Sequence, residues 1–162
     1  MEVNKTNDGF TINPYKIVVR QKILKSFSEL NKFNSAELLN SLSDDATYRF
    51  EGDHSLGGQR NSKAGIDKWF QRLFRLLPGQ FEVLSIIVIG FPWNTDAIIE
   101  FKDNVTPEFG EPYTNFGVQR IKLRFGKITQ IHTYVDTEKV TKALNELAKN
   151  GVEEATAKQI TA

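Results

Sequence analysis

The chain has 162 residues, of which 40% are hydrophobic and 25% are charged, a composition typical of one folded domain with a single core. Lys and Arg number 21 against 20 Asp and Glu, so the chain lacks the positive field needed to hold nucleic acid or an anionic membrane surface. There is no Cys and there are two His, which excludes disulfides, thiol chemistry and a His/Cys metal cluster. The N-terminal segment is polar and no apolar run approaches membrane-spanning length, so we expect a cytoplasmic protein.

Two helices are predicted at the start of the domain. Pro14 opens a long amphipathic helix, whose apolar residues recur at helical spacing as far as Phe33. Asn34 followed by Glu37 is a capping-box pattern, and it predicts the start of a short second helix.

A strand and a third helix follow. Residues 46–51 alternate as a strand does, with Tyr48 and Phe50 on one side. Ser62 caps the next amphipathic segment, and Pro78 ends it. The strand and the helix are joined by a loop that contains a pair of glycines.

The second half of the chain is dominated by strands. Four successive strands are predicted, and a helix over residues 137–151 closes the domain; the strands cover 81–91, 96–103, 112–125 and 127–136. The element order predicts an α+β fold, in which a curved antiparallel sheet wraps around the long N-terminal helix and the further helices. Such a sheet leaves a conical cavity between itself and the helices, as in a cystatin-like cone, and cavities of this kind bind ligands.

The chain divides into one domain and two ends. We expect residues 1–13 to form a flexible N-terminus, residues 14–150 the domain, and residues 151–162 a loosely held C-terminal tail. The sequence contains no internal repeat and no low-complexity linker.

Alternation along the last strand places its polar residues on the outer face of the sheet. Gln130, His132, Tyr134 and Asp136 share one side, and the apolar side should face the helices. Asp136 directly precedes the final helix, where a carboxylate accepts the unpaired N–H groups of the first turn. An active site is therefore not expected at His132, Tyr134 and Asp136.

The strand before it brings two amides to the covered face. Asn115 and Gln119 share a side with Ile121 and Leu123. A buried amide must be hydrogen-bonded, either by a ligand in the cavity or by a neighbouring protein group. The same alternation predicts a common buried layer, formed by Ile87, Ile121, Leu123 and Ile131.

These segments together resemble a known superfamily. The stretches SDDATYRFEG, LGGQRNSKAGIDKWF, VQRIKLRFGKI and YVDTEKVTKAL occur in the order and spacing of the nuclear-transport-factor-2-like superfamily. The resemblance covers residues 15–147 and is closest to the SnoaL-like and ketosteroid-isomerase-like branch. It implies the cone fold, and this fold carries isomerases, cyclases, hydrolases and binding domains alike.

The catalytic residues of the family are mostly replaced here. The resemblance places the proton-transferring Asp of ketosteroid isomerases at Phe50, the oxyanion-hole Tyr near Lys25 or Ser26, and the protonated Asp at Gln119. In proteins that resemble limonene-epoxide hydrolase, the Asp of the final strand corresponds to Thr133. Neither mechanism is complete in this chain.

The remaining candidates for acid–base chemistry are His54, Glu51 and Glu100. Glu51 and Glu100 are expected to face outward, which leaves His54, in the loop after the first strand. In this family that loop runs along the cavity mouth, and His is the side chain that titrates nearest neutral pH; an exposed loop histidine is the alternative. We expect the ligand to contact the cavity side chains Tyr48, Phe50, Trp69, Phe70, Asn115, Gln119 and Thr133.

Two classes of function follow. The first is a SnoaL-like domain that binds a small apolar molecule bearing a carbonyl or carboxylate, with isomerase, cyclase or hydrolase chemistry that needs no cofactor and no metal. The alternative is a non-catalytic ligand-binding or dimerisation domain with a degenerate pocket. The resemblance also implies a homodimer through the outer sheet face, with His132 or Tyr134 at or near the contact.

Overall fold

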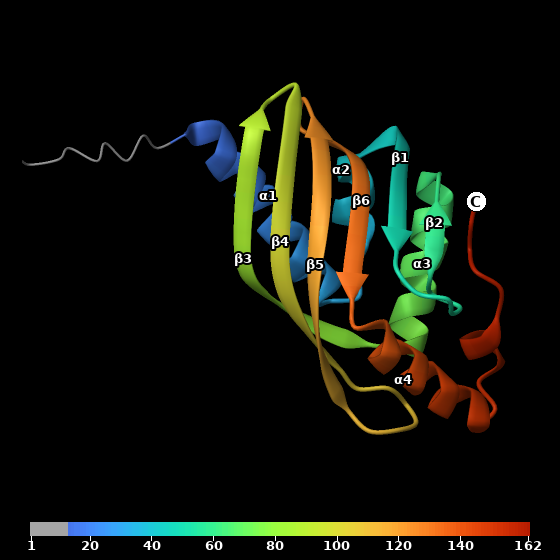
Figure 1. Ribbon diagram of the computed structural model, residues 1–162. Helices are drawn as coiled ribbons and strands as arrows, with labels where there is room; N and C mark the ends of the chain where they lie inside the picture. The colour runs from blue at the N-terminus through green and yellow to red at the C-terminus, as the bar shows by residue number, and fades with distance from the viewer. Residues whose placement is uncertain (1–12) are drawn as a thin grey trace, which may run out of the picture.

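The computed structural model describes residues 13–162, which fold as one curved sheet with helices packed on one face (Figure 1). The expected flexible N-terminus, residues 1–13, lies outside the described residues except for Asn13, whose side chain accepts a hydrogen bond from the Lys16 amide and caps the first helix. The helices are α1 Pro14–Leu30, α2 Ala36–Ser41, α3 Lys63–Leu76, α4 Thr137–Lys149 and the 3-10 turn η1 Glu153–Thr156.

The helix starts follow the capping residues of the sequence. The Ser62 hydroxyl accepts a hydrogen bond from the Gly65 amide at 3.0 Å and begins α3. The Asp136 carboxylate accepts hydrogen bonds from the amides of Glu138 and Lys139 and begins α4, as predicted. Asn34 accepts from the Ala36 amide at the start of α2.

Six strands form one sheet in the order β2-β1-β6-β5-β4-β3. They are β1 Leu42–Phe50, β2 Gly58–Arg60, β3 Gly79–Phe91, β4 Asn94–Val105, β5 Tyr113–Arg124 and β6 Lys127–Val135. The strands from β3 to β6 pair in sequence order through hairpins, as predicted. The expectation of a wholly antiparallel sheet is wrong at one place, because β1 pairs in parallel with β6 and the sheet is mixed. β1 ends at Phe50 and β6 begins at Lys127, so the sequence contains no short turn between them that would predict how they pair.

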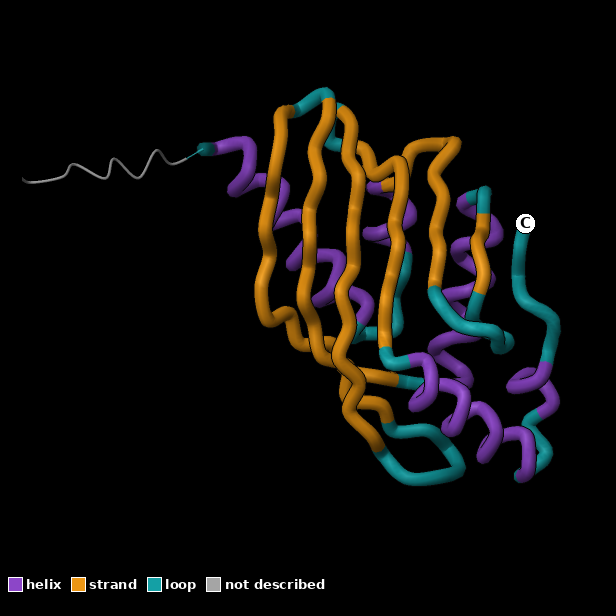
Figure 2. The backbone as a smooth tube through the Cα atoms, viewed as in Figure 1, coloured by secondary structure: helices purple, strands orange, loops and turns teal. Residues whose placement is uncertain are grey.

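The helices cover the concave face and leave the other face open. Figure 1 shows α1 running behind β3, β4 and β5, α2 behind β6, and α3 behind β1 and β2. The long strands bend toward the end where α4 crosses, so the sheet closes around the helices as a cone (Figure 2). The core lies between the two layers, and Phe27 of α1 packs there against Phe101 of β4. No helix within residues 13–162 is long and apolar enough to cross a membrane.

The predicted buried layer is confirmed for three of its four residues. Ile121, Leu123 and Ile131 are buried, whereas Ile87 is 55% exposed on the outer face. The segment around Ile87 is apolar on both sides, so alternation alone does not tell which side is covered. A register shift between Val83 and Ser85 sets the facing of this strand, and Ile86 points inward in its place.

The C-terminal segment 151–162 was expected to be loosely held and instead packs on the domain. Glu154 forms ion pairs with Arg72 and Arg75 of α3, and Ala155 is buried. The Gln159 amide donates hydrogen bonds to the carbonyls of the loop after β1. The apolar residues of this segment do not recur at the spacing of a helix or a strand, so the sequence does not show which part of the domain they contact.

Candidate functional site

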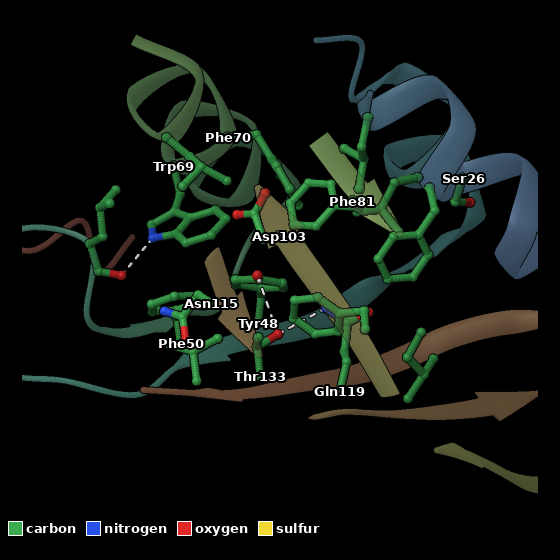
Figure 3. A pocket seen from close by; sticks show the side chains of 18 of the residues that line it. Ser26, Tyr48, Phe50, Trp69, Phe70, Phe81, Asp103, Asn115, Gln119 and Thr133 are labelled. Carbon is green, nitrogen blue, oxygen red and sulfur yellow. Dashed lines mark hydrogen bonds between the residues drawn. The ribbon is translucent and has the colours of Figure 1, made fainter. Parts of the chain in front are cut away.

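A cavity lies inside the cone, between the sheet and helices α1 and α3 (Figure 3). The space open to the centres of water molecules inside it is about 60 Å³. One buried water needs roughly 10–15 Å³ of such space, so the cavity has room for several waters or for a ligand of about six heavy atoms. Its lining is mostly aromatic and aliphatic, which is the usual character of a small-molecule site.

Every residue that the sequence placed in the cavity lines it, although they come from four different elements. Tyr48 and Phe50 project from β1, Trp69 and Phe70 from α3, Asn115 and Gln119 from β5, and Thr133 from β6. The three aromatic residues Tyr48, Trp69 and Phe70 pack on one another with ring centroids 4.7–5.5 Å apart. This mutual packing fixes the aromatic wall before any ligand enters.

A short row of polar groups crosses the cavity wall formed by the sheet. The Gln119 amide nitrogen donates to the Thr133 hydroxyl at 2.9 Å, and the Thr133 hydroxyl donates to the Tyr48 hydroxyl at 3.4 Å. Gln119 and Thr133 face each other across the β5–β6 ladder, which explains why they meet. Burial raises the pKa of Tyr48 to about 12, so its hydroxyl stays protonated at neutral pH and is available as a donor.

Asn115 has a structural partner. Its amide nitrogen donates to the Asp136 carbonyl at 3.1 Å, and its amide oxygen accepts from the Asp136 backbone N–H at 3.1 Å. These two bonds hold the end of β6 against β5 at the point where α4 begins. Both polar atoms of the Asn115 amide therefore have partners in the protein backbone, whereas the Gln119 amide bonds through its nitrogen to a side chain of the cavity wall.

The second polar feature of the cavity is Asp103 on β4. Its side chain lines the cavity, and in Figure 3 its carboxylate points to the side formed by Trp69 and Phe70. The Oδ1 atom is buried and has no hydrogen-bond partner among the described residues. Burial raises the pKa of the Asp103 carboxyl to about 7, because removing it from water disfavours the charged form.

Two neighbours define the surroundings of Asp103. Gly79 at the start of β3 leaves room for the carboxyl, since a Cβ there would lie 2.1 Å from Oδ1. Tyr113 lies nearby on β5, and its pKa is raised by burial and then by the Asp103 charge. A carboxyl kept near neutrality in an apolar cavity can both accept and donate a proton at physiological pH.

The sequence analysis missed Asp103 although a signal for it was present. Asp103 shares a strand side with Ile99 and Phe101, both of which are buried. Asp103 is the last residue of the predicted strand 96–103, and alternation was not followed to that end. β4 continues to Val105, which is also buried, and this places Asp103 inside the sheet.

The structure places His54 outside the lining of the cavity. It lies in the loop after β1, next to a surface groove between that loop, α4 and the C-terminal segment. Its Nδ1 atom accepts a hydrogen bond from the Leu56 amide at 3.3 Å, and its Nε2 atom is buried against Gly52. Burial lowers the pKa of His54, while the Asp53 carboxylate opposes this effect. The His54 ring lies 6.1 Å from the ring of Phe50, which separates it from the cavity, and the bond to the Leu56 amide fixes it in the loop.

The polar residues of the last strand lie on the outer face, as the sequence predicted. His132 Nε2 is 2.5 Å from the Glu51 carboxylate, and His132 Nδ1 is 3.0 Å from the Tyr134 hydroxyl. Hydrogen bonds from Arg49 and then His132 lower the pKa of Glu51 to about 2. These groups are separated from the cavity by the thickness of the sheet. Among residues 13–162, no three His, Cys, Asp or Glu side chains gather in a way that would hold a metal ion.

Comparisons with known proteins identify the fold. No family model and no curated protein matches the sequence. Solved structures do match: a putative isomerase from Bacillus subtilis superposes with a TM-score of 0.69 at 16% identity, covering 83% of this chain and 97% of that one.

Three further structures have the same architecture. A protein with a ketosteroid isomerase-like fold from Catenulispora acidiphila, in complex with trimethylamine, has a TM-score of 0.60 at 14% identity, with 79% and 90% of the chains covered. A putative polyketide cyclase from Sinorhizobium meliloti has a TM-score of 0.56 at 17% identity, with 70% and 94% covered. An NTF2-like protein of unknown function from Burkholderia pseudomallei reaches 0.68 at 13% identity, with 76% and 95% covered. The cone-shaped mixed sheet, the helices on its concave face and these superpositions together show that the chain has the nuclear-transport-factor-2-like fold.

Proposed function

We propose that this protein binds a small, largely apolar molecule inside the cone, with an oxygen atom of the ligand held by the row Gln119, Thr133 and Tyr48. The observation that carries the proposal is the aromatic cavity with this polar row across its sheet wall. Ligand sites of this kind combine an apolar lining with a few polar groups that fix orientation. A carbonyl oxygen can accept a hydrogen bond from the Tyr48 hydroxyl, and a carbonyl or carboxylate ligand is therefore the class expected at this row.

Binding of a matched set of small rings tests the proposal. Cyclopentanone and cyclopentanol carry an oxygen on a ring of suitable size, and cyclopentane carries none. We expect the oxygen compounds to bind more tightly than the hydrocarbon, with the difference reduced in Gln119→Leu and Tyr48→Phe. Arg124→Leu, on the exposed side of β5, is the control and should bind as the unmodified protein does. Equal affinity for cyclopentane and cyclopentanone would contradict the assignment of the polar row.

Acid–base catalysis is the second candidate function, and the Asp103 carboxyl favours it. Proton transfer is most effective when the pKa of the catalytic group lies near the working pH. The pKa of Asp103 is raised to about 7 and its carboxyl lines the cavity, whereas His54 does not. We therefore assign to Asp103 the role of proton carrier that the sequence suggested for His54, with the polar row stabilising the oxygen of an enol or enolate.

Deuterium exchange at the α-carbon of cyclopentanone in D2O measures this activity directly by NMR. We expect the protein to accelerate exchange over buffer and Asp103→Asn to remove the acceleration, while His54→Ala retains it. Loss of exchange in His54→Ala with retention in Asp103→Asn would return the role to the histidine. Absence of exchange in all three proteins would favour the non-catalytic binding domain.

We also propose that the chain forms a homodimer through the open face of the sheet. Ile87, Ile89, Phe116, Val118 and Tyr134 are large apolar or aromatic side chains exposed on this face. Strand pairing brings Val118 next to Tyr134, so these exposed side chains are adjacent on the surface rather than scattered singly. Light scattering at micromolar concentration should give the mass of two chains, and the mass of one chain would contradict the proposal.

A further inference from the structure

The Asp103 carboxylate lacks a counter-charge. None of the ion pairs formed within residues 13–162 includes the Asp103 carboxylate. Its Oδ1 atom is buried without a hydrogen bond among residues 13–162. Proteins pair buried charges, and an unpaired one in a cavity marks a place where a ligand can supply the missing partner.

The charged groups on the surrounding elements are engaged elsewhere. On β2, the buried Arg60 donates to the Gly57 carbonyl at 2.9 Å and lies over the rings of Tyr48 and Trp69, outside the cavity lining. On β5, Tyr113 is the titratable neighbour, and it carries no charge at neutral pH because its pKa is raised. Lys22 of α1 also lines the cavity, and its ammonium group donates to the Gly126 carbonyl. Lys102 of β4 pairs with Glu82 on β3, and Arg72 and Arg75 of α3 pair with Glu154.

The rings around the cavity add an attraction for positive charge. Phe70, Phe81, Phe101 and Tyr113 line the same cavity as Asp103. The face of an aromatic ring is electron-rich, and aromatic cages bind alkylammonium groups by this attraction. A carboxylate surrounded by such rings complements a cation with an apolar body better than it complements a neutral or an anionic ligand.

We propose that the cavity takes a ligand with a protonated amine, and that Asp103 is the residue that binds the ammonium group. The inference rests on the proposed function, since it names the ligand class of the same cavity. Asp103 holds the nitrogen, and the row Gln119, Thr133 and Tyr48 holds an oxygen elsewhere on the molecule. The polar row alone would accept a carboxylate as well as a carbonyl, but beside Asp103 the carboxylate is disfavoured, because it would place two negative groups in one apolar space.

The ionisation of Asp103 makes the proposal measurable. In the empty cavity, burial favours the protonated carboxyl, and its pKa is near neutral. An ammonium group favours the carboxylate, so amine binding should strengthen as the pH rises through 7 and release a proton near that pH. Binding of a neutral alcohol lacks this dependence.

Isothermal titration with cyclopentylamine, cyclopentanol and cyclopentanecarboxylate at pH 5.5 and pH 8.5 tests the inference. The amine is protonated at both values. At pH 8.5 we expect the amine to bind about tenfold or more tightly than the alcohol, as a desolvated ion pair or cation–π contact allows. At pH 5.5 this preference should fall to about threefold or less, because the Asp103 carboxyl is then protonated.

Two variants of β4 complete the design. Asp103→Asn keeps the shape of the side chain and should abolish the preference for the amine, whereas Glu100→Gln, an exposed carboxylate on the outer face of the same strand, should retain it. Equal affinities for the amine and the alcohol at pH 8.5, or an undiminished preference in Asp103→Asn, would overturn the inference and leave the proposed binding of oxygen ligands standing. Failure of all three compounds to bind would overturn both.

Discussion

Replacing Asp103 by Asn removes the one carboxyl that lines the cavity among residues 13–162, while keeping the size of the side chain. In the folded protein this carboxyl has a pKa of about 7, against an ordinary value of 3.8. The unfolded chain therefore ionises near pH 4, and the folded protein retains the proton up to about pH 7. Between these values the folded state binds more protons, so its stability falls as the pH rises.

The magnitude follows from the two pKa values. The proton affinity differs by about three powers of ten, and each power of ten corresponds to about 1.36 kcal/mol. Ionisation of Asp103 should therefore lower the free energy of unfolding by up to about 4 kcal/mol between pH 4 and pH 7, with no further loss above that range. For a chain of this length, 1 kcal/mol changes the melting temperature by roughly 2–4 °C, so the expected change is about 8–16 °C.

Urea unfolding of the unmodified protein and of Asp103→Asn at pH 4, 5.5, 7 and 8.5 isolates this contribution. The buried amide of Asn has a cost of its own, about 1–3 kcal/mol, but that cost does not depend on pH. The stability of Asp103→Asn relative to the unmodified protein should thus increase from pH 4 to pH 7 and then level off. Glu100→Gln, with the same change of charge on the exposed side of β4, should show no such increase.

A difference between the two proteins that stays constant with pH would refute the reasoning. It would mean that Asp103 ionises at its ordinary pKa, and hence that water or a counter-charge reaches the carboxyl. The case for a cavity carboxyl that titrates near neutral pH would then be lost, together with its proposed role in proton transfer.

Three further changes test other parts of the structure. Gln119→Leu should change the free energy of unfolding by less than about 1 kcal/mol, because the Thr133 hydroxyl keeps Tyr48 as a partner. The same substitution should weaken cyclopentanone binding. A loss of about 1–3 kcal/mol with unchanged binding would show that the amide is only structural. Val118→Asp should convert the proposed dimer to a monomer in light scattering without changing cavity binding, and an unchanged mass would place the contact elsewhere. Asp136→Ala should cost about 1 kcal/mol in urea unfolding, because the first turn of α4 loses its cap, and an unchanged stability would show that the cap contributes nothing.

Much of the sheet could be predicted from local pattern. Along β5, Ile121 and Leu123 alternate with Arg120 and Arg124, so only one facing buries the apolar side and exposes the charges. The caps at Ser62 and Asp136 likewise marked where helices begin, because few residue types satisfy the free N–H groups of a first turn. Gln119, Tyr48 and Thr133 could be placed in the cavity by the same alternation.

The errors arose where local pattern carries no information on facing or partners. β3 is apolar on both sides around Ile87, so a register shift decided which side is covered. The loop conformation decided where His54 lies, and a hydrogen bond from the Leu56 amide fixes its ring within the loop. Parallel pairing of β1 with β6 joins segments far apart in the chain, whose meeting depends on how the whole sheet closes.

The sequence by itself determined the class of fold, the helix starts and the side of the sheet on which most polar residues lie, because these depend on side-chain periodicity and on hydrogen bonds between near neighbours. Only the tertiary structure decided which partner each polar group finds. Asn115 and Gln119 lie four residues apart on one strand side, yet the first binds the backbone of Asp136 and the second contributes to the cavity row. Asp103 differs from Glu100 in the same way, since burial against Gly79 raises the pKa of Asp103, whereas Glu100 stays in water. The free energy of a charged or polar group depends on everything that surrounds it in space, and residues distant in sequence provide most of those surroundings.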